Sequence, residues 1–174
     1  MTIRSTHVFL FGDRQVGKTT AIHQFLRHDG LTADGIMTFW QLGDGEPRLF
    51  LSPYLATGRP EQQFQIAVGR PMDATQADAV FDTAGVQILD SCGQADVIVM
   101  DELGFLESGA PAFQEAVMRH IMGDVPIVGV LKRSPTPFLD SLRAHPRIKL
   151  LEVTLANRDL VPDAIRGRIL DEIQ

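Results

Sequence analysis

Short apolar runs alternate with segments of helical periodicity along most of this chain. The strand-like runs are residues 7–11, 97–100, 127–131 and 149–154, and two of them, 97–100 and 127–131, contain no polar side chain. Uninterrupted apolar runs are typical of strands that are buried on both faces of a parallel sheet. The alternation therefore predicts an α/β architecture in three layers, with a mainly parallel sheet between two layers of helices.

Helices are predicted where apolar residues recur three and four positions apart, as Ile22, Phe25 and Leu26 do. The longest of these segments contains Gly85, which lowers its helix propensity. The predicted helices are a first one that ends near Gly30, a second from Asp73 or Thr75 to Ser91, and others at 111–122, at 138–144 and from Val161 or Pro162 to Ile173.

A hairpin is predicted early in the chain, where residues 35–40 and 48–51 flank the turn signal Gly43-Asp44-Gly45. These strands lie too close in sequence for a crossover helix, so they are expected to be antiparallel. After a loop at 53–63, residues 64–69 predict a third short strand. Because no internal repeat, low-complexity tract or linker interrupts the pattern, we expect a single domain over residues 1–174.

The composition is ordinary for a globular protein, with 44% hydrophobic and 22% charged residues and a formal net charge of −6. An acidic surface argues against a general nucleic-acid binder, but a phosphate-binding loop creates a local positive field even in an acidic protein. Cys92 is the only cysteine, which excludes an intrachain disulfide and favours a reduced, cytoplasmic thiol. Residues 1–6 are too short and polar for a secretory signal, and no apolar run reaches the ~18 residues of a membrane helix. We therefore expect a cytoplasmic protein without a membrane partner.

The segment from Gly12 to Thr19 has the spacing G-x-x-x-x-G-K-T and lies between a predicted strand and a predicted helix. In such a loop the backbone N–H groups converge at the helix N-terminus, where the helix dipole also favours an anion. Lys18 can reach the outer phosphates, and the Thr19 hydroxyl can ligate Mg²⁺. The alternative is a chance glycine turn before a helix. The predicted nucleotide-binding residues of this segment are Gly12, Asp13, Arg14, Gln15, Val16, Gly17, Lys18, Thr19 and Thr20.

Two carboxylates, Asp101 and Glu102, follow the apolar run at 97–100 and are expected to emerge at the carboxyl end of this buried strand. The carboxyl ends of strands form the edge of an open α/β sheet where ligands bind. Asp101 is predicted to hold Mg²⁺ opposite Thr19, and Glu102 to polarise the water that attacks the γ-phosphate. The alternatives are a solvated strand end for the pair, and an ion pair or helix cap for Glu102.

Three cations are further candidates. Lys132 and Arg133 follow the strand at 127–131, so they are expected at the same edge, and either could contact the γ-phosphate. Arg133 is the predicted catalytic residue of the two, and a solvated basic pair is the alternative. Arg158 follows the last strand, where it could stack on the base or form a salt bridge with Asp159.

Five segments carry a family resemblance in their order along the chain. They are the loop from Phe11 to Thr20, Gly35-Ile36-Met37-Thr38, Val68-Gly69-Arg70, residues 97–107 with the sequence V-I-V-M-D-E-L-G-F-L-E, and Asn157-Arg158-Asp159. Together they resemble the small P-loop nucleoside-triphosphatase family of archaea, bacteria and animals, which includes the animal cancer-related nucleoside-triphosphatase. The most specific segment is D-E-L-G-F-L-E, where the family shows D-E-I-G-x-M-E.

This resemblance implies a P-loop fold of the catalytic-glutamate class, in which an extra strand separates the Walker A and Walker B strands. It also implies slow, Mg²⁺-dependent hydrolysis of several nucleoside triphosphates to diphosphate and phosphate. By similarity, Lys18 is expected to bind the phosphates. Thr19 and Asp101 are expected to bind the metal, and Glu102 is expected to act on the water.

The chain also departs from the family pattern. Gln15 stands where the family usually has a second loop glycine, and Phe39-Trp40-Gln41 replaces a segment with an acidic and then a basic residue. Trp40 and Tyr54 are assigned to the core rather than to base stacking.

Two other functions fit the same sequence, namely a nucleotide or small-molecule kinase and a nucleotide-dependent switch that hydrolyses slowly. The chain has no N-K-x-D guanine motif, and no protein partner is predicted.

Overall fold

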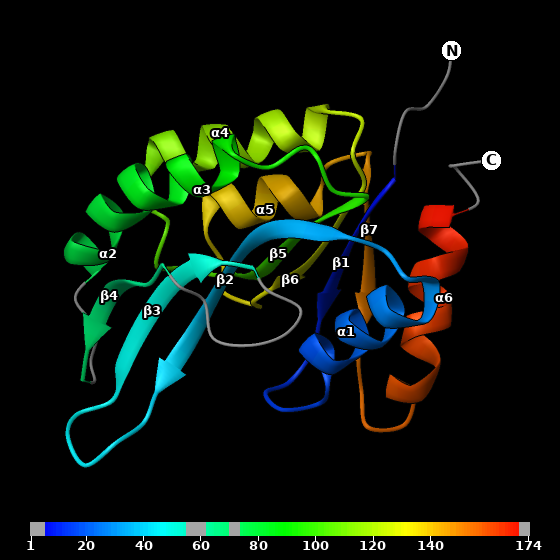
Figure 1. The fold of residues 1–174 in the computed structure, drawn as a ribbon, viewed down its shortest axis with the longest axis horizontal. Helices are drawn as coiled ribbons and strands as arrows, with labels where there is room; N and C mark the ends of the chain where they lie inside the picture. The colour runs from blue at the N-terminus through cyan, green and yellow to red at the C-terminus, as the bar shows by residue number, and fades with distance from the viewer. Residues whose placement is uncertain (1–5, 55–61, 70–73, 171–174) are drawn as a thin grey trace.

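The centre of the computed structural model, which describes residues 6–54, 62–69 and 74–170, is a seven-stranded sheet (Figure 1). Its strands are β1 (His7–Phe11), β2 (Ala33–Gln41), β3 (Arg48–Pro53), β4 (Phe64–Val68), β5 (Val97–Leu103), β6 (Ile127–Leu131) and β7 (Ile148–Glu152). They lie in the order β4-β3-β2-β5-β6-β1-β7. The neighbouring pairs β2–β5, β5–β6, β6–β1 and β1–β7 are parallel, whereas β3 is antiparallel to both β2 and β4. The mainly parallel sheet and the added antiparallel hairpin are therefore confirmed.

Helices cover both faces of this sheet (Figure 1). They are α1 (Lys18–Asp29), α2 (Ala74–Val80), the π-helical turn η1 (Phe81–Gly85), α3 (Val86–Asp90), α4 (Pro111–Met122), α5 (Pro137–Arg143), the 3₁₀ turn η2 (Arg158–Leu160) and α6 (Val161–Ile169). The long helix predicted around Gly85 is thus continuous, but it widens into a π turn there. A Cβ at Gly85 would lie 2.8 Å from a ring carbon of Phe113, so the glycine gives α4 room to approach.

Two hydrophobic cores form because successive side chains of a strand point to opposite faces of the sheet. In β1, Phe9 packs with residues of α2, α3, α4 and α5 on one face. Its neighbours Val8 and Leu10 pack with α1 and α6 on the other face. Both cores share the apolar central strands, which explains why the runs at 97–100 and 127–131 lack polar residues.

The acidic pair lies at the carboxyl end of its strand, as the sequence predicted. β5 continues through Asp101 and Glu102 to Leu103. Asp101 is in register with Met37 of β2, and Leu103 is in register with Leu131 of β6. Pairing on both sides therefore extends the strand beyond its apolar run.

The strand order brings the glycine loop, the acidic pair and the two cations Lys132 and Arg133 to one edge of the sheet. β6 separates β1, which leads into the glycine loop, from β5, which carries the acidic pair. Because the three strands are parallel, their carboxyl ends lie side by side. This is the extra strand between the Walker A and Walker B strands that the family resemblance implied.

Several predicted features lie outside the described residues. These are Asp73 as a helix cap, Arg70 of the third resemblance segment, most of the loop at 53–63, and the extension of the last helix to Ile173. Among the described residues, no helix is both long and apolar enough to cross a membrane.

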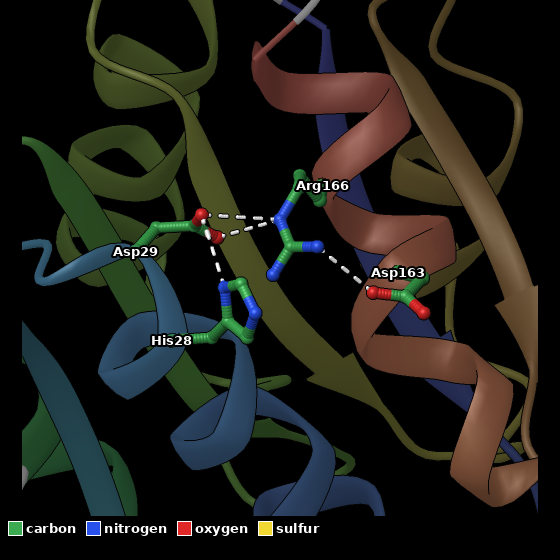
Figure 2. Close-up of polar contacts among 4 residues, drawn as sticks. All are labelled: His28, Asp29, Asp163 and Arg166. Atoms are coloured by element: carbon green, nitrogen blue, oxygen red, sulfur yellow. Dashed lines mark hydrogen bonds and ion pairs between the residues drawn. The ribbon is translucent and has the colours of Figure 1, made fainter.

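The C-terminal end of α1 is joined to α6 by a cluster of charged side chains (Figure 2). Arg166 Nε donates to both carboxylate oxygens of Asp29, at 3.1 and 2.8 Å, and Arg166 Nη1 donates to Asp163 at 2.9 Å. His28 Nδ1 lies 3.4 Å from Asp29. Burial opposes ionisation of Asp29, but the hydrogen bonds from Arg166 and His28 outweigh it and hold the pKa of that carboxyl below 3.8. The cluster fixes α6 against α1 at the end away from the glycine loop.

We expect Arg166→Gln to destabilise the fold at about pH 7 and to destabilise it less at about pH 3. A carboxyl with a depressed pKa stabilises the folded state above 3.8, its ordinary value, and loses that contribution as the pH falls further. Urea-unfolding midpoints of the variant and the wild type at the two pH values measure the effect. Arg168→Gln is the control, since Arg168 is exposed on the same helix and, among the described residues, donates only to the Ala164 carbonyl. Equal midpoint shifts for the two variants would contradict the assignment.

Candidate nucleotide-binding site

The glycine loop between β1 and α1 turns through three residues with positive φ. These are Gly12 at 146°, Gln15 at 58° and Gly17 at 103°. A Cβ at Gly12 would collide with the carbonyl oxygen of Val153, so only glycine allows the loop to pass that close to the segment after β7. Gly17 is the N-cap of α1, and its carbonyl accepts from Ala21 N at 2.9 Å. The N-terminus of α1 therefore opens directly into the loop.

Lys18 lies across this loop. Its Nζ donates to the Gly12 carbonyl at 2.9 Å and also to the Asp13 carbonyl. The pKa of Lys18 lies below that of an ordinary lysine because burial disfavours the ammonium, against the opposing effect of three carboxylates, of which Glu102 has the largest. The ammonium is thus held over the loop and within electrostatic reach of the acidic pair.

Thr19 and Asp101 meet at the start of α1, where Thr19 Oγ1 donates to Asp101 Oδ2 at 2.9 Å. Asp101 is buried, and this burial raises its pKa to about 6, with a smaller upward contribution from Glu102. A hydroxyl and a carboxylate are hard oxygen ligands, and a cation beside them would stabilise the ionised carboxylate. The donor set therefore fits a small divalent cation.

The remaining ligands of such a cation would be phosphate and water oxygens. Within the described part of the chain, no group of three or more His, Cys, Asp or Glu side chains could hold a metal. A Mg²⁺ site that relies on one or two protein ligands plus phosphates needs no such group.

Glu102 forms an ion pair with Lys132, whose Nζ lies 3.2 Å from Glu102 Oε1. The ion-pair alternative for Glu102 is therefore realised, and its partner is Lys132, which the sequence had suggested only as a contact of the γ-phosphate. Glu102 also has the largest electrostatic effect of any charged group on Lys18, so it lies between two lysines. A small cavity beside it is lined by Thr38, Trp40 and Lys132, among others.

Arg133 turns away from Glu102 toward the far side of the glycine loop. Its Nη2 lies 2.6 Å from Glu152 Oε1, and its Nη1 lies 3.9 Å from Asp13. Its guanidinium lies over the Phe11 ring at 5.7 Å. The role of Arg133 at the γ-phosphate stays a prediction. In the structure, Arg133 is paired with Glu152 of β7.

Arg158 lies beside the loop from the opposite direction. A Cβ at Gly17 would be 3.7 Å from Arg158 Cδ, and Arg158 Nε is 3.9 Å from the exposed carboxylate of Asp159. The salt bridge with Asp159, which was the alternative to base stacking, is therefore present with a long distance between the charged groups. Base stacking by Arg158 stays a prediction.

An open groove runs between residues 13–16 of the glycine loop and residues 153–156 after β7, with Arg133 at one side. Asn157 fixes the second wall. Its Oδ1 accepts from Thr154 N at 2.8 Å, and its Nδ2 donates to the Glu152 carbonyl at 2.9 Å. The sequence motif around Asn157 thus has a structural role that was not predicted.

Glu107 is a second residue that sequence reasoning left unassigned. It is 1% exposed, and its Oε1 accepts from Gly104 N. Burial raises its pKa to about 8. The sequence could have pointed to Glu107, because this residue ends the D-E-L-G-F-L-E segment of the family resemblance.

Tyr54 is buried, as predicted, and its ring lies 5.9 Å from that of His23. Its hydroxyl has no partner among the described residues. Burial, and to a lesser degree the charge of Asp101, raises the pKa of Tyr54. Trp40 packs against the core and also lines the cavity beside Glu102.

Comparisons with known proteins identify the family and the fold of this chain. The sequence model of the NTPase family matches residues 7–166. Nucleoside-triphosphatase THEP1 of Thermofilum pendens is 30% identical over 172 residues, which cover 92% of this chain and 93% of that protein. The human cancer-related nucleoside-triphosphatase is 28% identical over 188 residues, which cover 91% and 94% of the two chains. The crystal structure of THEP1 from the hyperthermophile Aquifex aeolicus has the same fold, with a TM-score of 0.69 at 19% identity over 94% of this chain and 99% of that one.

Gln15→Val is expected to destabilise the protein by about 1–2 kcal/mol, because a β-branched residue fits the left-handed region poorly. Gln15→Gly is expected to be close to neutral, since relief of strain offsets the added freedom of the unfolded chain. Urea unfolding measures both, and Arg14→Val, at an exposed neighbour without a positive φ, is the control. The same loss in Arg14→Val and Gln15→Val would show that backbone strain at Gln15 is not the cause.

Proposed function

This chain belongs to the NTPase family, and from that premise we propose that it hydrolyses nucleoside triphosphates, ATP among them, to diphosphate and phosphate in a Mg²⁺-dependent reaction. The observation that carries the proposal is the hydrogen bond between Thr19 and Asp101, beside Lys18 and Glu102. It joins the loop that would hold the phosphates to the strand that would supply the water-activating base.

The glycine loop would bind the β- and γ-phosphates. N–H groups at the start of α1 and the ammonium of Lys18 are positive groups in a partly buried position. Lys18 donates to two loop carbonyls, and phosphate oxygens are stronger acceptors for the same protons. Exchange of these partners on binding would move the ammonium from the loop backbone to the nucleotide.

Thr19 and Asp101 would hold Mg²⁺. When bound, the ion neutralises charge on the phosphates and on the leaving oxygen. Asp101 is suited to this role because its carboxylate is buried and accepts a hydrogen bond from Thr19. The hydroxyl that now donates to Asp101 would turn its oxygen toward the cation.

Glu102 would accept a proton from the attacking water. It is adjacent to the proposed metal ligand Asp101, yet the two carboxylates have different partners, since Asp101 accepts from Thr19 and Glu102 pairs with Lys132. Glu102 is the charged group that acts most strongly on Lys18, which supports a position near the phosphates. Water activation beside the metal ligand distinguishes a hydrolase from a passive nucleotide binder.

The nucleoside would lie in the groove between residues 13–16 and 153–156. Leu155 is exposed at 70% and offers an apolar contact for a base, and Arg158 offers a cation for stacking. No guanine-specific motif accompanies the groove, so we propose that ATP is one of several substrates.

Glu102→Gln is expected to lower phosphate release by about 10²–10⁴-fold while nucleotide still binds. Lys18→Ala is expected to weaken nucleotide binding itself, because it removes the cation over the loop. Phosphate release with Mg²⁺ and each nucleoside triphosphate, without any acceptor, measures turnover, and a fluorescent nucleotide measures affinity. Glu115→Gln, at an exposed glutamate on α4, is the control. Full turnover in Glu102→Gln would overturn the assignment of the base, and turnover that needs an acceptor would identify a kinase instead.

Removal of divalent cations with a chelator is expected to abolish phosphate release, and Mg²⁺ to restore it. Asp101→Asn is expected to raise the Mg²⁺ concentration that gives half-maximal turnover, since it removes the carboxylate ligand. Asp90→Asn, at an exposed carboxylate that pairs with Arg119, is the control. An unchanged Mg²⁺ dependence in Asp101→Asn would contradict this metal site.

A further inference from the structure

The carboxylate of Glu102 is anchored by an ion pair. Its nearest contact with Lys132 joins Oε1 to Nζ at 3.2 Å, and among the described residues Oε2 accepts no hydrogen bond. Glu102 is about one-third exposed, so its side chain would otherwise sample several rotamers. A base that must meet water in one orientation gains from such an anchor.

Lys132 is itself held in place by its surroundings. Its backbone N–H donates to the Leu103 carbonyl at 2.9 Å, at the end of the β5–β6 ladder. Its own carbonyl accepts from Arg143 Nη2 on α5, which also donates to the Ser134 carbonyl at 3.1 Å. Arg143 thus closes the turn that follows β6, and the backbone of Lys132 has little freedom.

The side chain of Lys132 is directed by a glycine. It lies across Gly104, where a Cβ would stand 2.9 Å from Lys132 Cδ. The absence of a side chain at Gly104 therefore opens the path along which the lysine stem runs to Glu102. The Gly104 N–H donates to the buried carboxyl of Glu107, so the backbone at this point is also fixed.

We propose that Lys132 is a positioning residue for hydrolysis. It holds Oε1 of Glu102 so that Oε2 accepts the proton of the attacking water, and Gly104 directs it there. This inference rests on the proposed function. Arg133 cannot take this role in the same conformation, because its guanidinium is engaged by Glu152.

In the step that Lys132 supports, the water oxygen forms a bond to the γ-phosphorus, and its proton passes to Glu102 Oε2. The bond between that phosphorus and the bridging oxygen breaks, and its electron pair remains on the diphosphate. The products are nucleoside diphosphate and phosphate. Lys132 gains and loses no proton in this step, since its contribution is the orientation of the base.

Lys132→Met is expected to lower kcat by about 10–100-fold and to leave the affinity for a fluorescent nucleotide triphosphate within about threefold. Lys132→Arg is expected to recover part of the loss, because it restores a donor to Glu102. Lys149→Met, at an exposed lysine of β7, is the control. Gly104→Ala tests the geometry with every charge retained, and it is expected to lower kcat because the new methyl displaces the lysine stem.

The double variant Glu102→Gln/Lys132→Met separates positioning from a direct action on the phosphates. If Lys132 acts through Glu102, the double variant is expected to have the same kcat as Glu102→Gln alone. Multiplicative losses in kcat would overturn the inference, as would a kcat within twofold of wild type in Lys132→Met. Thermal melting identifies any variant that fails to fold, and Gly104→Ala and Lys132→Arg then carry the test.

Failure of the inference differs from failure of the proposed function. If the wild type releases no phosphate, or if Glu102→Gln retains full turnover, the proposed function is wrong. If Glu102→Gln is inactive and Lys132→Met is fully active, only the role of Lys132 is wrong.

Discussion

One hydrogen bond, from Thr19 Oγ1 to Asp101 Oδ2, joins the first helix to the strand that carries the acidic pair, across 82 residues of sequence. It depends on the register of three parallel strands, since β6 lies between β1 and β5 and must bring their ends level. A slip of one residue in β5 would turn Asp101 to the opposite face of the sheet. The apolar side chains that bury β5 on both faces oppose such a slip, so the packing of the core also fixes the site.

Charge at this edge is balanced among close neighbours. Lys18 and Lys132 flank Glu102, and Asp101 lies beside Thr19 with its carboxylate buried. A chain of net charge −6 can therefore present a local site for a polyanion, provided that the cations project from the loop and the strand ends. The burial of Asp101 makes an uncompensated charge there costly, so the groups are best understood as one unit.

Much of the fold could be predicted from local patterns. The uninterrupted apolar runs identified the central strands, the short spacing around Gly43 identified the hairpin, and the loop from Gly12 to Thr19 lies where strand and helix patterns meet. The continuation of β5 to Leu103, past the two carboxylates, could not be predicted, because it depends on the pairing of Leu103 with Leu131 of β6. The π turn at Gly85 likewise depends on Phe113 of a different helix.

The sequence by itself determined which chemical groups this protein has and how they are spaced: a phosphate-type loop, a hydroxyl beside its lysine, and two adjacent carboxylates after an apolar run. The tertiary structure alone decided which groups meet. Lys132 and Arg133 are neighbours that leave β6 in different directions, one to Glu102 of β5 and the other across Phe11 to Glu152 of β7. The physical reason is that both cations follow β6 at its carboxyl end, between β5 on one side and β1 and β7 on the other, so strands that are remote in sequence supply the partner of each cation.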